Sequence, residues 1–317
     1  MKWMEKTITQ PFPEPVQSLV EAIRRSYGEH VVAVLMYGSC LRSGDPFDGL
    51  VDLYVLVDDY NKAYRKRWLS WANRLLPPNV FYLEANYQGR TLRAKYAVIT
   101  AKDFERGMRW FHSYLWGRFS QPCLILHIGE LDKVDAVLPK AEQSIPQWVA
   151  KVLIKAAATF VTNTVPMLPP CFDVRTLWTT GLQLSYGAEL RAEMGESRAN
   201  QLFDYAKNYY QTLTPFLIQQ LPYAKKKETE SYCLEIPETK RLRCRILWKV
   251  RRLQGKILSL LRLIKALFTF QGGVDYIIWK LERHSGRTIE VPPKVRRHPL
   301  VFGWVMLWRL YRQGIFR

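Results

Sequence analysis

Apolar residues in the first third of the chain follow two different spacings, and each spacing predicts a different kind of element. Apolar positions three and four residues apart predict a helix over Pro15–Tyr27, which Gly28 would end. Two short apolar runs rich in β-branched residues, His30–Gly38 and Leu50–Val57, predict buried strands. A loop rich in glycine, aspartate and proline separates the two runs, so the first strand would end at a bend.

The next stretch predicts a hairpin that leads into more helix. Strands over Val80–Ala85 and Leu92–Ile99 would flank a turn at Gln88–Gly89, where glycine permits the backbone angles of a tight turn. A helix is expected from about Lys102. Strands and helices in this order predict an α+β fold.

Helical spacing dominates from residue 145 onward. Ile145–Thr162, Phe172–Leu190 and Ser197–Leu221 predict helices, and the charged stretch Lys225–Glu238 predicts a flexible joint. We therefore expect three regions: an α/β domain over residues 1–138, a small helical domain over residues 139–224, and a basic helical region over residues 225–317.

The stretch Lys240–Gln271 has a continuous helical pattern. It holds ten Lys and Arg residues and no acid. Its apolar residues recur at steps of three and four, which predicts one long helix with a single apolar face and cations mostly on the other sides. Basic amphipathic helices of this kind are typical of membrane surfaces. The apolar row consists of Leu242, Ile246, Val250, Leu253, Ile257, Leu260, Ile264 and Leu267.

The aromatic and basic segment Pro299–Arg317 favours the same interpretation. Its aromatic residues Trp304, Trp308 and Tyr311 would suit the headgroup boundary of a bilayer. The alternative is a terminal helix that packs on the rest of the protein with its cations in solvent.

Positive charge is concentrated in this last third of the chain. Of the 47 Lys and Arg residues and the 28 acids that give a net charge of +19, 22 and 7 lie in residues 225–317. This balance indicates an anionic partner, either nucleic acid or anionic lipid. The longest uninterrupted apolar run, Leu300–Trp308, is too short to span a bilayer. We therefore expect attachment to a membrane surface through residues 240–317.

The cysteines and the amino-terminal residues bear on the compartment. Five cysteines are scattered along the chain without the spacing of a metal site, and we interpret them as reduced thiols. The first residues lack the apolar stretch of a signal peptide. These features predict a cytoplasmic protein attached peripherally to the inner face of the membrane.

Gly38 and Ser39 follow the first predicted strand, and Asp52 lies in the second. A glycine at such a bend lets the backbone approach a triphosphate closely, and the serine adds a hydroxyl and an N–H group. A carboxylate on the neighbouring strand could hold Mg²⁺ against the phosphates. A second acid two residues later would complete a common metal pair, but that position is Tyr54. An ordinary turn between two strands is the alternative interpretation.

Five segments extend this pattern, in order, over most of residues 30–220. They are Tyr37–Ser39, Val51–Tyr54, Lys95–Ile99, Trp110–Pro122 and Gly181–Glu193. In sequence and spacing they resemble the mitochondrial-type phosphatidate cytidylyltransferases, the peripheral CDP-diacylglycerol synthases. The chain departs from that family's usual residues at Cys40, Leu53, Ala97 and Gln121, which suggests a divergent, bacterial branch.

The resemblance implies a polymerase-β-type nucleotidyltransferase domain with a mixed sheet, followed by a helical, winged-helix-like domain. The nucleotide would be held by Gly38, Ser39, Lys95 and Arg118, with Asp52, Ser39 and Lys95 as catalytic residues and Arg191 at the lipid phosphate. Asp48, Asp58, Asp59 and Glu84 could each supply a second metal ligand or be a solvated loop acid, and we assign Glu84 beside Asp52. The alternatives are a surface lysine for Lys95, a salt bridge for Arg118 and a helix-surface arginine for Arg191.

The function implied is synthesis of CDP-diacylglycerol and pyrophosphate from CTP and phosphatidic acid at a membrane surface, with Mg²⁺ as cofactor and no nucleic acid partner. The phosphate that attacks CTP is already an anion at neutral pH, so positioning and charge neutralisation would do most of the catalysis. Two alternatives stay open. One is a nucleotidyltransferase of the same fold that modifies RNA or protein, and the other is a non-catalytic, membrane-bound scaffold.

Overall fold

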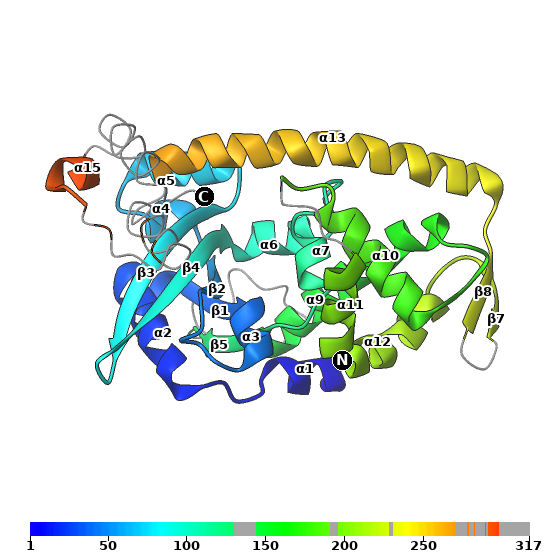
Figure 1. The fold of residues 1–317 in the computed structure, drawn as a ribbon, viewed down its shortest axis with the longest axis horizontal. Helices are drawn as coiled ribbons and strands as arrows, with labels where there is room; N and C mark the ends of the chain where they lie inside the picture. Colours follow the sequence, from blue (N-terminus) through cyan, green and yellow to red (C-terminus); the bar gives the residue numbers. More distant parts are fainter. Residues whose placement is uncertain are drawn as a thin grey trace.

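The computed structural model of the protein describes residues 1–129, 144–190, 196–227, 231–269, 278, 282, 289 and 291–297. The fold is α+β, with a mixed sheet in one half and a helical bundle in the other (Figure 1). Arg191 and the segment Pro299–Arg317, for which we predict lipid contacts, lie outside the described residues. None of the helices within the described residues is long and apolar enough to cross a membrane.

The larger sheet has five strands in the order β3-β4-β2-β1-β5. Strands β2 and β4 are parallel, and every other neighbouring pair is antiparallel, which makes the sheet mixed. The predicted hairpin is β3 and β4, with Gln88 and Gly89 at positive φ in its turn. The strands are β1 (Val31–Tyr37), β2 (Val51–Val57), β3 (Asn79–Tyr87), β4 (Arg90–Thr100) and β5 (Leu124–Ile128).

Each face of this sheet is covered differently. Helix α2 (Gln17–Tyr27) packs on one face through an apolar row. The other face packs against α6 (Ala101–Gly107), α7 (Trp116–Phe119) and α9 (Ile145–Thr164). Asp52, Tyr54 and Leu56 alternate with residues of the first face, so their side chains point toward these three helices. The sheet therefore presents Asp52 to the boundary with the helical half.

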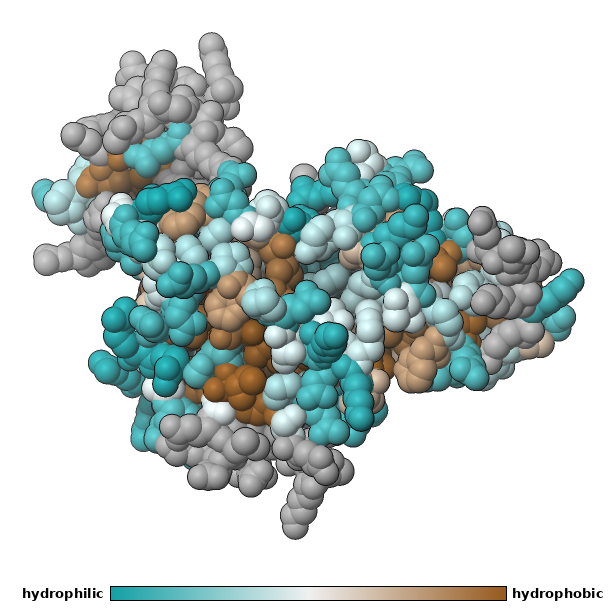
Figure 2. All heavy atoms as spheres, turned by 90° about the horizontal axis from the view of Figure 1, so that it is seen from below, coloured by the Kyte–Doolittle hydropathy of each residue, from teal (hydrophilic) through white to brown (hydrophobic). Residues whose placement is uncertain are grey.

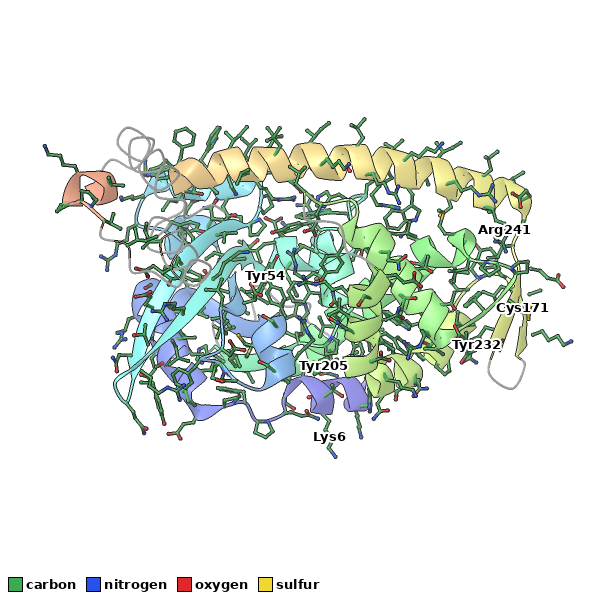
Figure 3. All side chains as sticks on the ribbon, in the orientation of Figure 1. Lys6, Tyr54, Cys171, Tyr205, Tyr232 and Arg241 are labelled. Carbon is green, nitrogen blue, oxygen red and sulfur yellow. A yellow bond between two sulfur atoms is a disulfide. The ribbon has the colours of Figure 1, made fainter. Side chains whose placement is uncertain are left out.

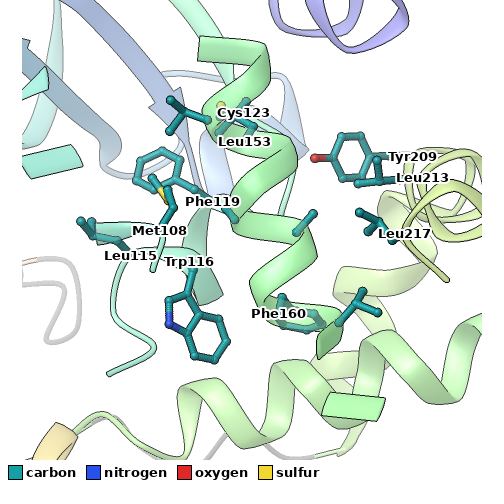
Figure 4. Packing of buried hydrophobic residues seen from close by; sticks show 14 of the residues in the cluster. Met108, Leu115, Trp116, Phe119, Cys123, Leu153, Phe160, Tyr209, Leu213 and Leu217 are labelled. Atoms are coloured by element: carbon teal, nitrogen blue, oxygen red, sulfur yellow. The ribbon is translucent and has the colours of Figure 1, made fainter. Parts of the chain in front are cut away.

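Helix α9 is the centre of the helical half. Figure 4 shows α9 between side chains on its sheet side, such as Phe119 of α7, and side chains of α12, such as Leu213. One buried cluster runs from the sheet through α9 to α12, so the two halves share a continuous core. The shared core does not test the predicted division into three regions, which stays a prediction. The other helices of this half are α1 (Lys2–Ile8), α10 (Val174–Tyr186), α11 (Glu196–Tyr205) and α12 (Lys207–Gln219).

A second, three-stranded sheet corrects two of our expectations. It is formed by β6 (Cys171–Asp173), β8 (Ser231–Glu235) and β7 (Ala224–Lys227), all antiparallel. The stretch predicted as a flexible joint is thus mostly strand, because its backbone pairs with a segment far away in the sequence. Cys171 and Cys233 face each other in this sheet and form a disulfide, so the prediction of reduced thiols is wrong for this pair.

Helix α13 (Glu238–Thr269) is 32 residues long and lies along one edge of the molecule, across both halves (Figure 1). Its apolar row faces outward, and Figure 3 shows side chains projecting from this edge away from the body. Leu253 in this row is 64% exposed, whereas Arg251 on the inner side is 3% exposed. A Cβ on Gly255 would lie 2.2 Å from the Ala188 carbonyl oxygen, so this glycine permits the close crossing.

The inner side of α13 is anchored by polar contacts. Arg251 donates from Nε to the Phe111 carbonyl at 2.6 Å and from Nη2 to Asn163 at 2.8 Å. Arg262 donates to the Pro77 carbonyl at 3.2 Å, next to the end of β3. The long helix is therefore confirmed, with its apolar face unpartnered by the described part of the chain and several of its cations turned inward.

Several short elements complete the fold. The predicted helix over Ser197–Leu221 is divided into α11 and α12, and helix α5 lies in a stretch for which we predicted no element. The short elements are η1 (Glu14–Val16), η2 (Gly28–His30), α3 (Ser39–Ser43), α4 (Tyr60–Ala63), α5 (Arg67–Leu75), η3 (Val165–Met167) and α15 (Pro293–Arg297).

Candidate active site

The bend after β1 lies directly against the carboxylate of Asp52. Strands β1 and β2 are adjacent, and Tyr37 pairs with Asp52 in their register. Gly38 has φ +92°, and a Cβ at this position would lie 2.5 Å from Asp52 Oδ2. Only glycine fits here, because a side chain would collide with the carboxylate and the backbone angle disfavours other residues. The structure therefore brings the glycine-serine bend and Asp52 together.

A pocket opens at this bend, between the sheet half and the helical half. Its cavity volume is about 100 Å³, and it widens toward solvent into a space of about 750 Å³. Tyr205 on α11 donates to the Leu41 carbonyl at 3.1 Å and so joins the two halves at the pocket. The lining residues that matter for chemistry are Gly38, Ser39, Arg42, Asp52, Arg118 and Arg198.

Lys95 is a direct neighbour of Asp52 on the sheet. In the parallel register of β2 and β4, Asp52 pairs with Lys95, so both side chains leave the same face. Lys95 is only partly buried and does not line the pocket itself. Its flexible stem could bring the ammonium toward a phosphate held near Asp52. The predicted role of Lys95 is thus compatible with its position and stays a prediction.

Glu84 lies on the same face but farther away. Its strand, β3, is two strands from β2, which places it about 10 Å to the side of Asp52 at the usual strand spacing. Its carboxylate accepts from Tyr82 at 2.6 Å and from Arg93 at 3.1 Å, and it does not line the pocket. The structure does not bring Glu84 to Asp52, and its role as a metal ligand stays a prediction.

The donor set at the bend fits Mg²⁺ in a limited way. Among the described residues, no three His, Cys, Asp or Glu side chains form a cluster that could hold a metal, and Asp52 is the only carboxylate of the described pocket lining. Mg²⁺ is commonly bound by one or two carboxylates together with substrate phosphates and water. Asp52 could therefore hold the ion if the nucleotide supplies most of the other ligands.

Two other candidate acids, Asp58 and Asp59, lie away from the bend. Asp58 and Asp59 follow the far end of β2 from Asp52. Asp58 contacts His30 at 3.1 Å, and Asp59 caps α4 by accepting from the Asn61 N–H at 2.7 Å. These contacts are those of local structural acids.

Tyr54 occupies the position where a second acid would be usual, and it makes a hydrogen bond with Arg118. Its hydroxyl accepts from Arg118 Nη1 at 3.1 Å, and its side chain is fully buried (Figure 3). Arg118 also donates from Nη2 to both carboxylate oxygens of Glu189, at 3.2 and 3.3 Å. The salt bridge that was the alternative for Arg118 is thus present. The predicted phosphate contact of Arg118 is untested, although the side chain does line the pocket.

The electrostatics keep these groups in defined charge states. Burial opposes the charge of Arg118, but the Glu189 carboxylate beside it holds the pKa of Arg118 above its ordinary value. Burial and the nearby Asp52 carboxylate raise the pKa of Tyr37, so its phenol stays neutral. The same two causes raise the pKa of the Cys40 thiol to about 11, which makes Cys40 a poor nucleophile at neutral pH.

Tyr114 links Arg118 to helix α13. The guanidinium carbon of Arg118 lies 4.4 Å from the centre of the Tyr114 ring, and that of Arg262 lies 3.9 Å from the same centre. Both distances are within the range of cation–π contacts. A single ring therefore connects the pocket arginine with helix α13.

Sequence reasoning missed two arginines of the pocket and the partner of a third. Arg42 comes from α3 and Arg198 from α11, so the two approach the pocket from different halves. Arg42 lies three residues after Ser39, which could have pointed to it. Arg198 and Glu189 carry no comparable local signal, because only the fold brings them to the bend.

Comparison with known proteins gives one weak similarity, which bears on the kind of activity and does not test the site residues. No model of a known protein family matches the chain. The mitochondrial phosphatidate cytidylyltransferase of Bos taurus is 25% identical to it over 237 residues. That match covers 68% of this chain and 62% of the bovine protein, so the chain spans less than two thirds of that relative. The similarity suggests a cytidylyltransferase and leaves the substrates to be tested.

Proposed function

We propose that this protein transfers a cytidylyl group from CTP to phosphatidic acid and releases pyrophosphate. The observation that carries the proposal is the contact between the Asp52 carboxylate and the Gly38 bend, in a pocket lined by three arginines. The weak similarity to the bovine phosphatidate cytidylyltransferase supports the same reaction.

In this proposal the chain mainly positions and neutralises phosphates. The backbone at Gly38 and Ser39 accommodates the triphosphate, and Asp52 holds Mg²⁺, which supplies positive charge against the phosphate oxygens when it is bound. Lys95 approaches from the neighbouring strand as a point charge. A phosphate oxygen of phosphatidic acid attacks the α-phosphorus of CTP, and the bond to pyrophosphate breaks on the opposite side.

Arg42 and Arg198 are suited to the outer part of the triphosphate or to the lipid phosphate. Arginine forks match phosphate geometry, and these two come from the two halves of the molecule. Binding of a polyanion between them would draw the halves together. Arg118, already paired with Glu189, would fix the pocket wall.

Attachment to an anionic membrane is the second part of the proposal. The outward apolar row of α13 runs from Leu242 to Phe268, roughly 39 Å at the usual rise per residue. Exposed cations such as Lys249, Arg252 and Lys256 flank this row, and each contributes about 1 kcal/mol near an anionic leaflet. We propose that α13 lies on the cytoplasmic face of the membrane, where it gives the pocket access to a lipid substrate.

The orientation of α13 also bears on the alternative acceptors. A helix that binds nucleic acid needs exposed cations but no exposed apolar row, whereas the outer surface of α13 combines exposed cations such as Lys249 with a long apolar row. This arrangement favours lipid over RNA as the partner of α13.

The decisive experiment measures pyrophosphate release by the purified protein with CTP, Mg²⁺ and phosphatidic acid vesicles. Asp52→Asn should lower the rate roughly a thousandfold, as expected for loss of a charge that acts on the reacting phosphate. Asp45→Asn is the matched control, because Asp45 is an exposed acid in the loop before β2 whose carboxylate accepts from the Phe47 N–H. Release that requires RNA or protein instead of the lipid would favour the alternative acceptors. Equal rates for the two variants would refute the role of Asp52.

A further inference from the structure

Helix α5 carries an exposed apolar row of its own. Trp68, Trp71 and Leu75 are 45%, 67% and 69% exposed, and their steps of three and four place them on one side of the helix. The other side is buried, with Leu69 and Ala72 in contact with the core. Single exposed apolar residues are common, but two tryptophans and a leucine in one row form a patch that requires a partner.

This row rests on a rigid support. Asn73 is fully buried on the inner side of α5 and donates from Nδ2 to the Tyr64 hydroxyl and to the Val98 carbonyl, both at 2.9 Å. Its Oδ1 accepts from the Asn79 N–H at 2.8 Å. These bonds fix α5 to strands β3 and β4, so the tryptophans cannot turn inward by a small adjustment.

The surroundings of the row are basic. Arg65, Lys66, Arg67 and Arg74 are all exposed, and Arg74 contacts the Asp59 carboxylate at 3.7 Å. Tryptophan flanked by cations is typical of proteins that touch the headgroup region of a bilayer, because the ring has an apolar body and a polar N–H group. The charge favours an anionic surface.

Helix α5 packs against the inner side of α13, near the carboxyl-terminal end of that helix. Lys265 of α13 donates to the Leu76 carbonyl and, at 2.8 Å, to the Pro78 carbonyl, which follow the last turn of α5. The two helices contact each other, and Figure 1 places α5 beside the end of α13 that holds Phe268. Figure 2 shows the opposite face of the molecule, where hydrophilic side chains surround an apolar area.

We infer that Trp68, Trp71 and Leu75 form a second contact with the anionic bilayer, next to the row on α13. The inference rests on the membrane attachment proposed above and deepens it. One helix lying on a surface leaves the protein free to roll about the helix axis. A second contact beside it removes that freedom, so the mouth of the pocket keeps one orientation relative to the lipid.

The test compares binding of the full chain to phosphatidylcholine vesicles with and without phosphatidylglycerol. Trp68→Gln/Trp71→Gln should weaken binding to the anionic vesicles about tenfold or more, since two apolar side chains no longer insert. The matched control is Phe216→Gln, because Phe216 is 50% exposed and its helix, α12, lies on the side of the molecule away from α13 (Figure 1). A third variant, Leu253→Gln/Ile257→Gln, tests α13 separately.

The outcomes separate the two ideas. Loss of binding in the α13 variant with normal binding in the tryptophan variant would overturn the α5 contact alone. Absence of binding by the unaltered protein would overturn the attachment itself. A protein that is a dimer in solution and becomes a monomer in the tryptophan variant would identify the row as a protein interface and also overturn the inference.

A variant that removes exposed charges tests the same contact without the risk of a folding defect. Arg65→Gln/Lys66→Gln changes no buried residue, so it should keep the melting temperature of the unaltered protein. Its binding should be severalfold weaker at low salt, and the difference should shrink at high salt as screening increases. Unchanged binding at low salt would contradict an anionic partner for α5.

Discussion

The pocket at Gly38 and the outer face of α13 use side chains in opposite ways. In the pocket, polar groups meet partners within the chain: Arg118 meets Glu189 and Tyr54, and Asp52 lies against the bend. On α13, the apolar row meets no partner among the described residues, although the inner cations of the same helix are satisfied by carbonyl groups. The first pattern is typical of a preorganised binding site, and the second is typical of a surface that binds a partner.

The strongest test of this contrast removes the outer row. Leu253→Gln/Ile257→Gln/Leu260→Gln should weaken binding to anionic vesicles roughly a thousandfold, about tenfold for each apolar side chain that no longer inserts. The melting temperature should be unchanged, because these side chains are half exposed. Turnover of a short-chain, soluble phosphatidate should also be unchanged. A large fall in stability would mean that the row packs within the protein.

The converse variant should affect chemistry alone. Gly38→Ala places a methyl group against Asp52 Oδ2 and imposes an unfavourable backbone angle, so the carboxylate must move. We expect turnover to fall roughly a hundredfold, the usual effect of a displacement near 1 Å in an active site. Vesicle binding, measured in parallel, should equal that of the unaltered protein. Normal turnover would show that Asp52 need not lie at the bend.

The two pocket arginines give a smaller and more specific effect. Arg42→Ala and Arg198→Ala should each raise the KM for CTP or phosphatidate about tenfold, as for one lost charge-assisted hydrogen bond. Measuring both KM values assigns each arginine to one substrate. Arg106→Ala is a suitable control, because Arg106 is exposed and pairs only with Asp103. Identical KM values in all three variants would exclude contact with either substrate.

The features that depend on neighbouring residues could be predicted from the sequence. The strands, the bend and the period of α13 depend on neighbouring residues, and the structure confirms them at Gly38, at Asp52 and along the row from Leu242. Period alone also predicted the cations on the other sides of α13, but it could not show that Arg251 and Arg262 turn inward. That result depends on which carbonyl groups the folded body presents.

The remaining features come from contacts between distant segments. Arg118 and Glu189 are 71 residues apart, and Cys171 and Cys233 are 62 apart, so no local pattern pairs them. The strands around Cys233 were predicted as a joint because their lysines and glutamates disfavour strand formation in isolation. Helix α5 was not predicted because its row of only three apolar residues is too short to show a clear helical period.

The smallest predicted effect lies at the boundary between the two regions. His112 is largely buried, and burial together with Arg262 and Arg251 lowers its pKa to about 4. Between pH 6.5 and 4 the unfolded chain binds this proton more readily than the folded one, so the stabilisation present above pH 6.5 is lost as the pH falls through that window. The melting temperature should drop by a few degrees there. His112→Phe should flatten this dependence, and an unchanged profile would assign it to other groups.

Tyr114 has a consequence for how location and activity are connected. Its ring is in contact with an arginine that lines the pocket at Gly38 and with one from the long outer helix. A shift of that helix on arrival at a bilayer, or on departure from it, would disturb the ring and with it the hydrogen bonds between Arg118 and Glu189. Under the proposed activity and attachment, this series of contacts would let membrane binding change the rate.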